Sequence, residues 1–351
     1  MKKINSRSLN GFINYGLVIA FFAVFQILSS MGLLSNSFTG QLIPICAYVV
    51  MALSLNLVVG ISGELSLGHA GFMSVGAFTG VIVSTVLQGT VEFTPIRLAL
   101  AMAIGAVTAG IAGVIIGIPV LRLQGDYLAI VTLAFGEIIR NVLNCVYLGM
   151  DSTGLHFSMQ DAMSMGLEED GITIMNGPMG AVGVQKISTF LAGIILILVV
   201  LFVIQNMVNS RSGRAISAIR DNRIAAEACG LNVTKYKMMA FVTSAAMAGA
   251  AGALYALNFS TVVPKKFDFN TSILILVFVV LGGIGNLRGS MIAAAVLTVL
   301  PELLRGFEDF RMLAYAVVLI LVMIIGNNPQ AKALIRRFAD LFRKKKEKEG
   351  T

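Results

Sequence analysis

The sequence RSGRAISAIRDNRIAAEACG, residues Arg211–Gly230, guides the interpretation of the whole chain. It is polar, rich in arginine and compatible with a helix, and it stands between two long apolar runs, Ile187–Ser210 and Met238–Asn258. A chain that is apolar on both sides of one compact charged segment is expected to cross a membrane and to expose that segment on one side. We interpret the segment as a docking surface for another protein.

The composition is that of an integral membrane protein. Hydrophobic residues make up 57% of the 351 residues and charged residues only 13%, whereas soluble proteins contain about 25% charged residues. We therefore predict an all-α integral membrane protein, a polytopic bundle of about ten (eight to ten) membrane-spanning helices. The apolar run after Lys2, Lys3 and Arg7 is too long for a signal peptide, so we expect a retained first helix.

Ten apolar runs could form these helices. They are Asn14–Leu34, Gln41–Gly60, Leu65–Val91, Leu98–Leu121, Tyr127–Leu148, Ile187–Ser210, Met238–Asn258, Phe269–Leu287, Gly289–Pro301 and Met312–Asn328.

Small residues recur at every fourth position in several runs, which lets helix backbones approach closely in lipid. These stripes are Gly105, Ala109, Gly113 and Gly117, then Ser244, Ala248, Gly252 and Ala256, and the pair Gly76 and Gly80.

The distribution of Lys and Arg predicts the topology. With the N-terminus inside and ten crossings, the inner segments carry 19 of these residues and the outer segments 6, as the positive-inside rule requires. Both termini are therefore predicted to be cytoplasmic. The predicted regions are a cytoplasmic N-terminus (1–13), a transmembrane domain (14–328) with an extracytoplasmic loop (149–186) and a cytoplasmic loop (209–237), and a basic cytoplasmic tail (329–351). The outer loop could fold as a small cap or be a solvated acidic loop. We expect the tail to contact anionic lipid rather than nucleic acid.

Two glycine-rich sequences join pairs of apolar runs. The first break is GISGELSLGHAG, Gly60–Gly71, and the second break is LGGIGNLRGS, Leu281–Ser290. Irregular backbone at membrane depth is tolerated only inside protein or along a cavity, and broken helices mark substrate routes in transporters. Tight turns at the membrane surface would look similar, so both interpretations stay open. The candidate residues are Gly63, Glu64, Ser66, Gly68, His69, Gly282, Gly283, Gly285 and Asn286.

Glu137 and Arg140 are charged residues inside an apolar run. They are three positions apart, so they share a helix face and can pair. Glu137 lies about 15 Å into the membrane, where a charge is costly unless it is paired and faces the bundle interior. A structural ion pair and a place on a translocation path both fit this position. We expect His69 to form a hydrogen bond at a helix interface.

Motifs of several enzyme and metal-binding classes are absent. The sequence contains no GxxxxGK[ST], HExxH, CxxC or GxSxG, so we expect neither a metal nor a catalytic site in this chain. If ATP drives its activity, the ATPase is a separate chain, and ATP and magnesium are cofactors of that partner alone. We expect Cys46, Cys145 and Cys229 to be buried small apolar residues, because they lack metal-site spacing.

Four stretches of the chain carry family motifs. They are LSLNLVVGISGELSLGHAGFMSVGAFTG (Leu53–Gly80), LQGDYLAIVTLAFGEIIRNVLN (Leu123–Asn144), GRAISAIRDNRIAAEACGLNVTKYKMMAFVTSAAMAGAAGALYA (Gly213–Ala256) and LGGIGNLRGSMIAAAVLTVLPELLR (Leu281–Arg305). In family order, they resemble the membrane subunits of branched-chain amino acid ABC importers. The second stretch is similar to the M-type permease in particular.

The resemblance implies a permease subunit that carries branched-chain or related aliphatic amino acids across a bacterial inner (plasma) membrane. Its implied partners are a second, H-type permease, two cytoplasmic ATPase subunits and an extracytoplasmic substrate-binding protein. It also implies an ATPase-coupling loop, with Gly213, Arg214, Arg220, Asp221, Glu227 and Gly230 as its residues. The residues agree with this, since Ser217–Cys229 has helix-compatible composition with small alanines, and Gly230 fits the position just after a helix end.

The chain departs from the family pattern in three places. Gly289-Ser290 stands where the family has Gly-Pro, the outer loop is enlarged around Asp151–Gly171, and NNPQAK (Asn327–Lys332) replaces Arg-Pro-Gln-Gly. These departures leave the substrate open, because related permeases carry urea, short amides or other amino acids. The alternative is an ion-coupled secondary transporter that works without an ATPase and has Glu137 and Arg140 in its ion path.

Overall fold

The computed structural model describes most of the chain. Described are residues 6–31, 36–123, 125–151, 154–161, 163–167, 171–304, 310, 313, 316–317 and 320. The predicted basic tail (329–351) lies outside these residues, as do residues 1–5 and most of the last apolar run, Met312–Asn328. The chain divides into two units, residues 1–295 and 296–351.

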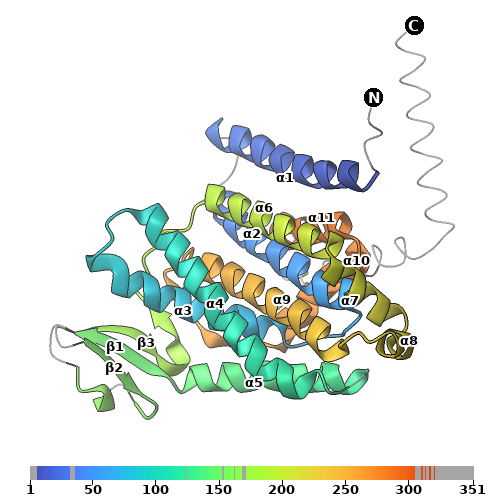
Figure 1. Ribbon diagram of the computed structural model, residues 1–351. Helices are drawn as coiled ribbons and strands as arrows, with labels where there is room; N and C mark the ends of the chain where they lie inside the picture. The colour runs from blue at the N-terminus through green and yellow to red at the C-terminus, as the bar shows by residue number, and fades with distance from the viewer. Residues whose placement is uncertain are drawn as a thin grey trace, which may run out of the picture. The chain divides into compact units, whose positions relative to one another are not determined.

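The first unit is mainly helical (Figure 1). Its α-helices are α1 (Ser6–Ser30), α2 (Asn36–Asn56), α3 (His69–Val86), α4 (Thr94–Val120), α5 (Asp126–Asn144), α6 (Phe190–Asn209), α7 (Arg211–Asp221), α8 (Arg223–Ala228), α9 (Val233–Ala256) and α10 (Phe269–Gly282). Helix α11 (Leu287–Leu303) begins in the first unit and ends in the second. A π-helix, η1 (Leu57–Ser62), continues α2, and 3-10 turns lie at η2 (Leu87–Gly89), η3 (Met163–Met165), η4 (Gly177–Met179) and η5 (Pro264–Lys266).

Five helical stretches among the described residues are long and apolar enough to cross a membrane. They are Phe38–Ser62, His69–Gly89, Thr94–Val120, Phe190–Asn209 and Val233–Ala256. Helix α1 contributes a shorter apolar stretch, Asn14–Leu28. The chain is therefore a mainly helical membrane protein, and the number of ten crossings stays a prediction.

Helix α9 packs against α2, α3 and α4 (Figure 1). Small residues make this packing close. A Cβ on Gly76 would lie 2.3 Å from the Gly249 Cα, and one on Gly249 would lie 2.3 Å from the Gly105 carbonyl oxygen. A Cβ on Gly252 would lie 2.0 Å from the Met73 carbonyl oxygen. The predicted stripes of small residues are thus confirmed as contact faces of α3, α4 and α9.

The prediction of an all-α chain is wrong in one region. An antiparallel sheet of order β2-β1-β3-β4-β5 follows α5. Its strands are β1 (Tyr147–Asp151), β2 (Gly154–Ser158), β3 (Ile172–Asn176), β4 (Ala181–Val182) and β5 (Thr261–Val262). Strands this short leave little alternation in the sequence, and β5 pairs with β4 from a distant part of the chain. The segment that could form a cap does fold, but as a sheet.

The helices of the first unit connect two ends of a bundle. At the end we call the sheet end, α5 and α9 finish and α6 begins, next to the strands. Helix α6 leads away from the sheet into α7 and α8, and α9 returns to the sheet. Helices α7 and α8 therefore lie at the opposite end, which we call the α7 end (Figure 1).

Candidate functional site

The α7–α8 segment, residues Arg211–Ala228, is two helices where we predicted one. The Asn222 backbone is extended, with φ −155° and ψ 102°, and its side chain accepts a hydrogen bond from the Ala225 N–H at 3.0 Å. Asn222 thus ends α7 and caps α8. At the start of α7, the Ser210 hydroxyl accepts from the Gly213 N–H at 3.1 Å, and Arg214 Nη1 donates to the Asn209 carbonyl at 3.4 Å.

The end of α8 agrees with the prediction. Gly230 has a φ of 82°, in the left-handed region that favours glycine. Its N–H donates to the Glu227 carbonyl at 2.9 Å, and the Leu231 N–H donates to the Ala226 carbonyl at 3.0 Å. These two bonds form a Schellman motif, in which a glycine after the helix end satisfies the last carbonyls.

A small apolar core holds the α7–α8 segment on α9. Ile219 of α7, Ala226 of α8 and Val233 of α9 are buried together, and Leu231 and Tyr236 pack against them. Folding removes these apolar side chains from water, and this hydrophobic burial stabilises the segment. The segment is therefore a folded part of the protein with a defined outer face.

The outer face of α8 is both apolar and charged. Ile224 is 81% exposed, and Ala225, Glu227 and Ala228 are exposed as well. Glu227 accepts a hydrogen bond from Arg223 Nε at 2.9 Å, so it pairs within its own helix. Sequence reasoning identified Glu227 and the alanines but missed Ile224. The sequence does not distinguish Ile224 from Ile216 and Ile219 of the same segment, which are buried.

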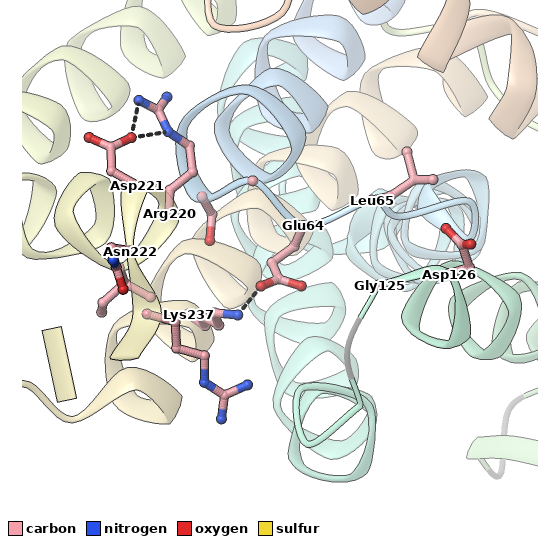
Figure 2. Close-up of a pocket in the computed structure, with 12 residues that line it drawn as sticks. Glu64, Leu65, Gly125, Asp126, Arg220, Asp221, Asn222 and Lys237 are labelled. Carbon is pink, nitrogen blue, oxygen red and sulfur yellow. Dashed lines mark hydrogen bonds and ion pairs between the residues drawn. The ribbon is translucent and has the colours of Figure 1, made fainter. Parts of the chain in front are cut away.

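A cavity of about 340 Å³ lies between the α7–α8 segment and the first break (Figure 2). Its lining residues are Ser62, Gly63, Glu64, Leu65, Gly125, Asp126, Ile219, Arg220, Asp221, Asn222, Arg223 and Lys237. Lys237 Nζ of α9 donates to Glu64 Oε1, and both side chains are 11% exposed. Glu64, predicted as part of a helix break, therefore anchors that break to the start of α9 beside the α7–α8 segment.

Arg220 joins the α7–α8 segment to the first break directly. Its Nη1 donates to the Gly60 carbonyl at 3.0 Å, and its Nε and Nη2 donate to Asp221 Oδ1 at 3.1 and 2.9 Å (Figure 2). Gly63, with φ 77°, lies beneath the arginine stem, where a Cβ would come within 2.6 Å of Arg220 Cγ. The glycine thus allows both the turn and the close approach.

The first break enters the bundle after Gly63. His69, the first residue of α3, is buried, and its Nε2 lies 2.7 Å from the Ser54 hydroxyl of α2. The Ser54 carbonyl accepts a hydrogen bond from the Ser244 hydroxyl at 2.6 Å, and Ser244 lies about 16 Å along α9 from its start. Helix α3 therefore begins inside the bundle, and the predicted helix-interface hydrogen bond of His69 is confirmed.

Side chains of neighbouring helices satisfy the backbone of this buried break. The Leu67 N–H donates to the Thr132 hydroxyl of α5 at 3.1 Å, and the Ala70 N–H donates to the Ser272 hydroxyl of α10 at 3.1 Å. A Cβ on Gly68 would lie 2.0 Å from the Thr132 carbonyl oxygen. This is the arrangement that irregular backbone inside a membrane bundle requires. The buried Ser66 hydroxyl has no hydrogen-bond partner among the described residues.

The second break is a tight turn between α10 and α11. Gly283 and Gly285 have φ values of 94° and 80°, and a Cβ on Gly282 would lie 2.3 Å from the Gly289 carbonyl carbon. Asn286 Oδ1 accepts from the Gly289 N–H at 3.4 Å, at the start of α11. The first break is therefore irregular backbone inside the bundle and the second is a tight turn, and a place for either on a substrate route stays a prediction.

The pairing of Glu137 and Arg140 on α5 is confirmed. Arg140 donates from Nε and Nη2 to Glu137 Oε2 at 2.9 and 2.5 Å. The side chains of Arg140 and Glu137 are 25% and 30% exposed. In this chain alone the pair is therefore not enclosed by protein, whereas a charge at membrane depth needs cover or water.

The prediction of buried cysteines is right for Cys46 and wrong for Cys145 and Cys229, which are exposed. Both exposed cysteines follow the last turn of a helix, α5 and α8, where the chain leaves the packed face. Within the described part of the chain, no three His, Cys, Asp or Glu side chains lie close enough together to hold a metal ion.

Comparisons with known proteins assign the chain to a family. Residues 37–326 match the model of a family described as branched-chain amino acid transport system / permease component. The chain is 38% identical over 287 residues to the high-affinity branched-chain amino acid transport system permease protein LivM of Salmonella typhimurium, and 36% identical to LivM of Escherichia coli K12. Each alignment covers 79% of this chain and 66% of the relative, so the chain spans just under two thirds of the length of these relatives. A probable LivM of Methanocaldococcus jannaschii is 25% identical over 69% of this chain and 74% of its own length. No solved structure matches the chain.

Proposed function

Because the chain belongs to the family of branched-chain amino acid transport permease components, we propose that it is the permease subunit of an ATP-binding-cassette importer. Its cargo is a branched-chain or related aliphatic amino acid delivered by an extracytoplasmic binding protein. A second, H-type permease completes the membrane part, and two cytoplasmic ATPase subunits use ATP and magnesium. This chain is then a transport subunit of a bacterial inner membrane without a catalytic site of its own.

The observation that carries the proposal is the attachment of the α7–α8 segment to the first break. Arg220 donates to the Gly60 carbonyl, and Lys237 pairs with Glu64 next to it. A force on the exposed face of α8 is therefore transmitted to the membrane-embedded break without passing through a flexible linker. This is what an ATPase-coupling segment must do.

The distribution of charge supports the orientation. The α7 end carries the basic residues of the α7–α8 segment and of the start of α9, and the positive-inside rule places such residues in the cytoplasm. In the proposed topology of ten crossings with cytoplasmic termini, the sheet end then faces the binding protein. The partly exposed Glu137–Arg140 pair then lies on the translocation path, where the second permease covers α5.

Reversal of the Glu227 charge tests the coupling role. The complete complex, with both permeases, the ATPases and the binding protein, is reconstituted in vesicles, and leucine uptake and leucine-stimulated ATP hydrolysis are measured. Glu227→Lys is expected to lower both by at least about tenfold, since unlike charges replaced by like ones at an interface cost several kcal/mol. The matched control is Glu227→Asp, which keeps the negative charge at the same position.

Two results would contradict the proposal. Unchanged uptake and ATP hydrolysis in Glu227→Lys would remove the coupling role from the segment. Accumulation of substrate by this chain alone, driven by an ion gradient, would instead support a secondary transporter. Competition by urea, short amides and valine against labelled leucine separates the possible cargo classes.

A further inference from the structure

Asn56 contacts the second break and lies just before the first break in the chain. It is the last residue of α2, fully buried, and is followed directly by the π-helix η1. Its Nδ2 donates to the Ser290 hydroxyl at 2.8 Å, and its Oδ1 accepts from the Gly285 N–H at 2.8 Å. Both ends of one amide are therefore engaged with the turn between α10 and α11.

The two breaks also touch through their backbones at this point. A Cβ on Gly60 would lie 2.4 Å from the Gly285 nitrogen and 2.0 Å from Asn56 Oδ1. The Gly60 carbonyl is the group that accepts from Arg220 Nη1 at 3.0 Å. Gly60 thus contacts the α7–α8 segment through its carbonyl and the second break through its Cα. π-Helical turns such as η1 occur frequently at functional sites.

Burial makes these contacts hard to separate. Asn56 and Ser290 are both 0% exposed, so water does not replace the bond between them when it is lost, and a buried polar group without a partner is destabilising. If η1 moves with Arg220, the turn between α10 and α11 must follow it or lose both hydrogen bonds to Asn56. Because losing these hydrogen bonds is unfavourable, η1 and the turn between α10 and α11 are expected to move together.

We infer that Asn56 is a positioning residue that makes the two breaks move as one unit when the α7–α8 segment moves. It acts through Gly285 and Ser290 rather than on the cargo. The inference rests on the proposed function, because it assigns to Asn56 the transmission of that segment's displacement from the first break to the second. It predicts that loss of the Asn56 amide separates ATP hydrolysis from transport.

The test measures leucine taken up per ATP hydrolysed by the complete complex in vesicles. In Asn56→Ala, the rate of ATP hydrolysis is expected to stay within about twofold of the original, while uptake falls about tenfold, a change equivalent to 1.4 kcal/mol. Ser290→Ala removes one of the two hydrogen bonds and is expected to lower the ratio less. The matched control is Thr108→Val, which removes an interhelical hydrogen bond to the Thr79 hydroxyl, 3.0 Å long and away from both breaks.

An unchanged ratio, or a parallel fall of uptake and hydrolysis, in Asn56→Ala would overturn the inference. If Asn56→Ala does not assemble, Ser290→Ala decides, and a normal ratio in that variant is the contrary result. Glu227→Lys in the same preparation separates the two proposals. If Glu227→Lys blocks uptake while Asn56→Ala keeps the normal ratio, the coupling segment stands and only the role of Asn56 fails.

Discussion

Replacing Lys237 by methionine is expected to destabilise the protein by about 3–5 kcal/mol, because it leaves the Glu64 carboxylate buried without its partner. Both side chains are only 11% exposed, and Glu64 has no other hydrogen-bond donor among the described residues. The neighbouring cavity of about 340 Å³ gives water partial access to the carboxylate. We therefore expect a value near the lower limit, about 3 kcal/mol.

The double variant Glu64→Leu/Lys237→Met distinguishes the loss of the whole ion pair from the loss of one partner. It removes both charges and keeps similar volumes, so its stability is expected to lie within about 1 kcal/mol of the original protein or above it. With the single variants Glu64→Leu and Lys237→Met it forms a double-mutant cycle. The coupling energy between the two positions is expected to be several kcal/mol, far more than distant sites give.

Unfolding in detergent, followed by far-ultraviolet circular dichroism, measures these differences. The control is Lys265→Met, which removes an exposed charge and is expected to change stability by no more than about 0.5 kcal/mol. A loss below about 1 kcal/mol in Lys237→Met, or additive losses in the double variant, would refute the assignment of a buried, mutually dependent pair.

Three further predictions concern packing and docking. Gly76→Val should destabilise the protein by about 3 kcal/mol or more and lower its melting temperature, because the new Cβ would lie 2.3 Å from the Gly249 Cα. The control Gly89→Ala should leave the melting temperature unchanged, because no atom lies within 4 Å of its Cβ. Ile224→Asp should weaken binding of the ATPase subunits at least tenfold in a titration, as loss of a large interface anchor does, and should leave the melting temperature unchanged because Ile224 is 81% exposed. Asn222→Ala should cost about 1 kcal/mol and raise hydrogen exchange at the amides of α8, since it removes the bond to the Ala225 N–H.

The predictions that succeeded rest on short-range spacing. Residues four apart share a helix face, so the stripe that contains Gly252 could be assigned to a helix contact before the partner helix was known. The pairing of Glu137 with Arg140 follows from the same geometry. Gly230 could be placed after a helix end because glycine adopts a positive φ without cost.

The predictions that failed, and the features that the sequence did not predict, depend on contacts between distant parts of the chain. Nothing near Glu64 indicates that Lys237 will meet it, so the sequence suggested only a polar residue in a break. Asn56 was read as part of an apolar run, because its partners Gly285 and Ser290 lie in another segment. Strand β5 is recognisable only from its pairing with β4.

The sheet ties together the segments that lead into α6 and out of α9. Beyond the pairing of β4 with β5, backbone hydrogen bonds join the segment before α6 to the segment after α9. The Val184 N–H donates to the Ser260 carbonyl at 3.0 Å, and the Ile187 N–H donates to the Leu257 carbonyl at 3.1 Å. If this end stays fixed, α9 can pivot about it as a rod about 36 Å long. A tilt of about 5° would then displace the opposite end of α9 by about 3 Å. The α7–α8 segment, which packs on α9, and the first break, which pairs with Lys237, would then be displaced together.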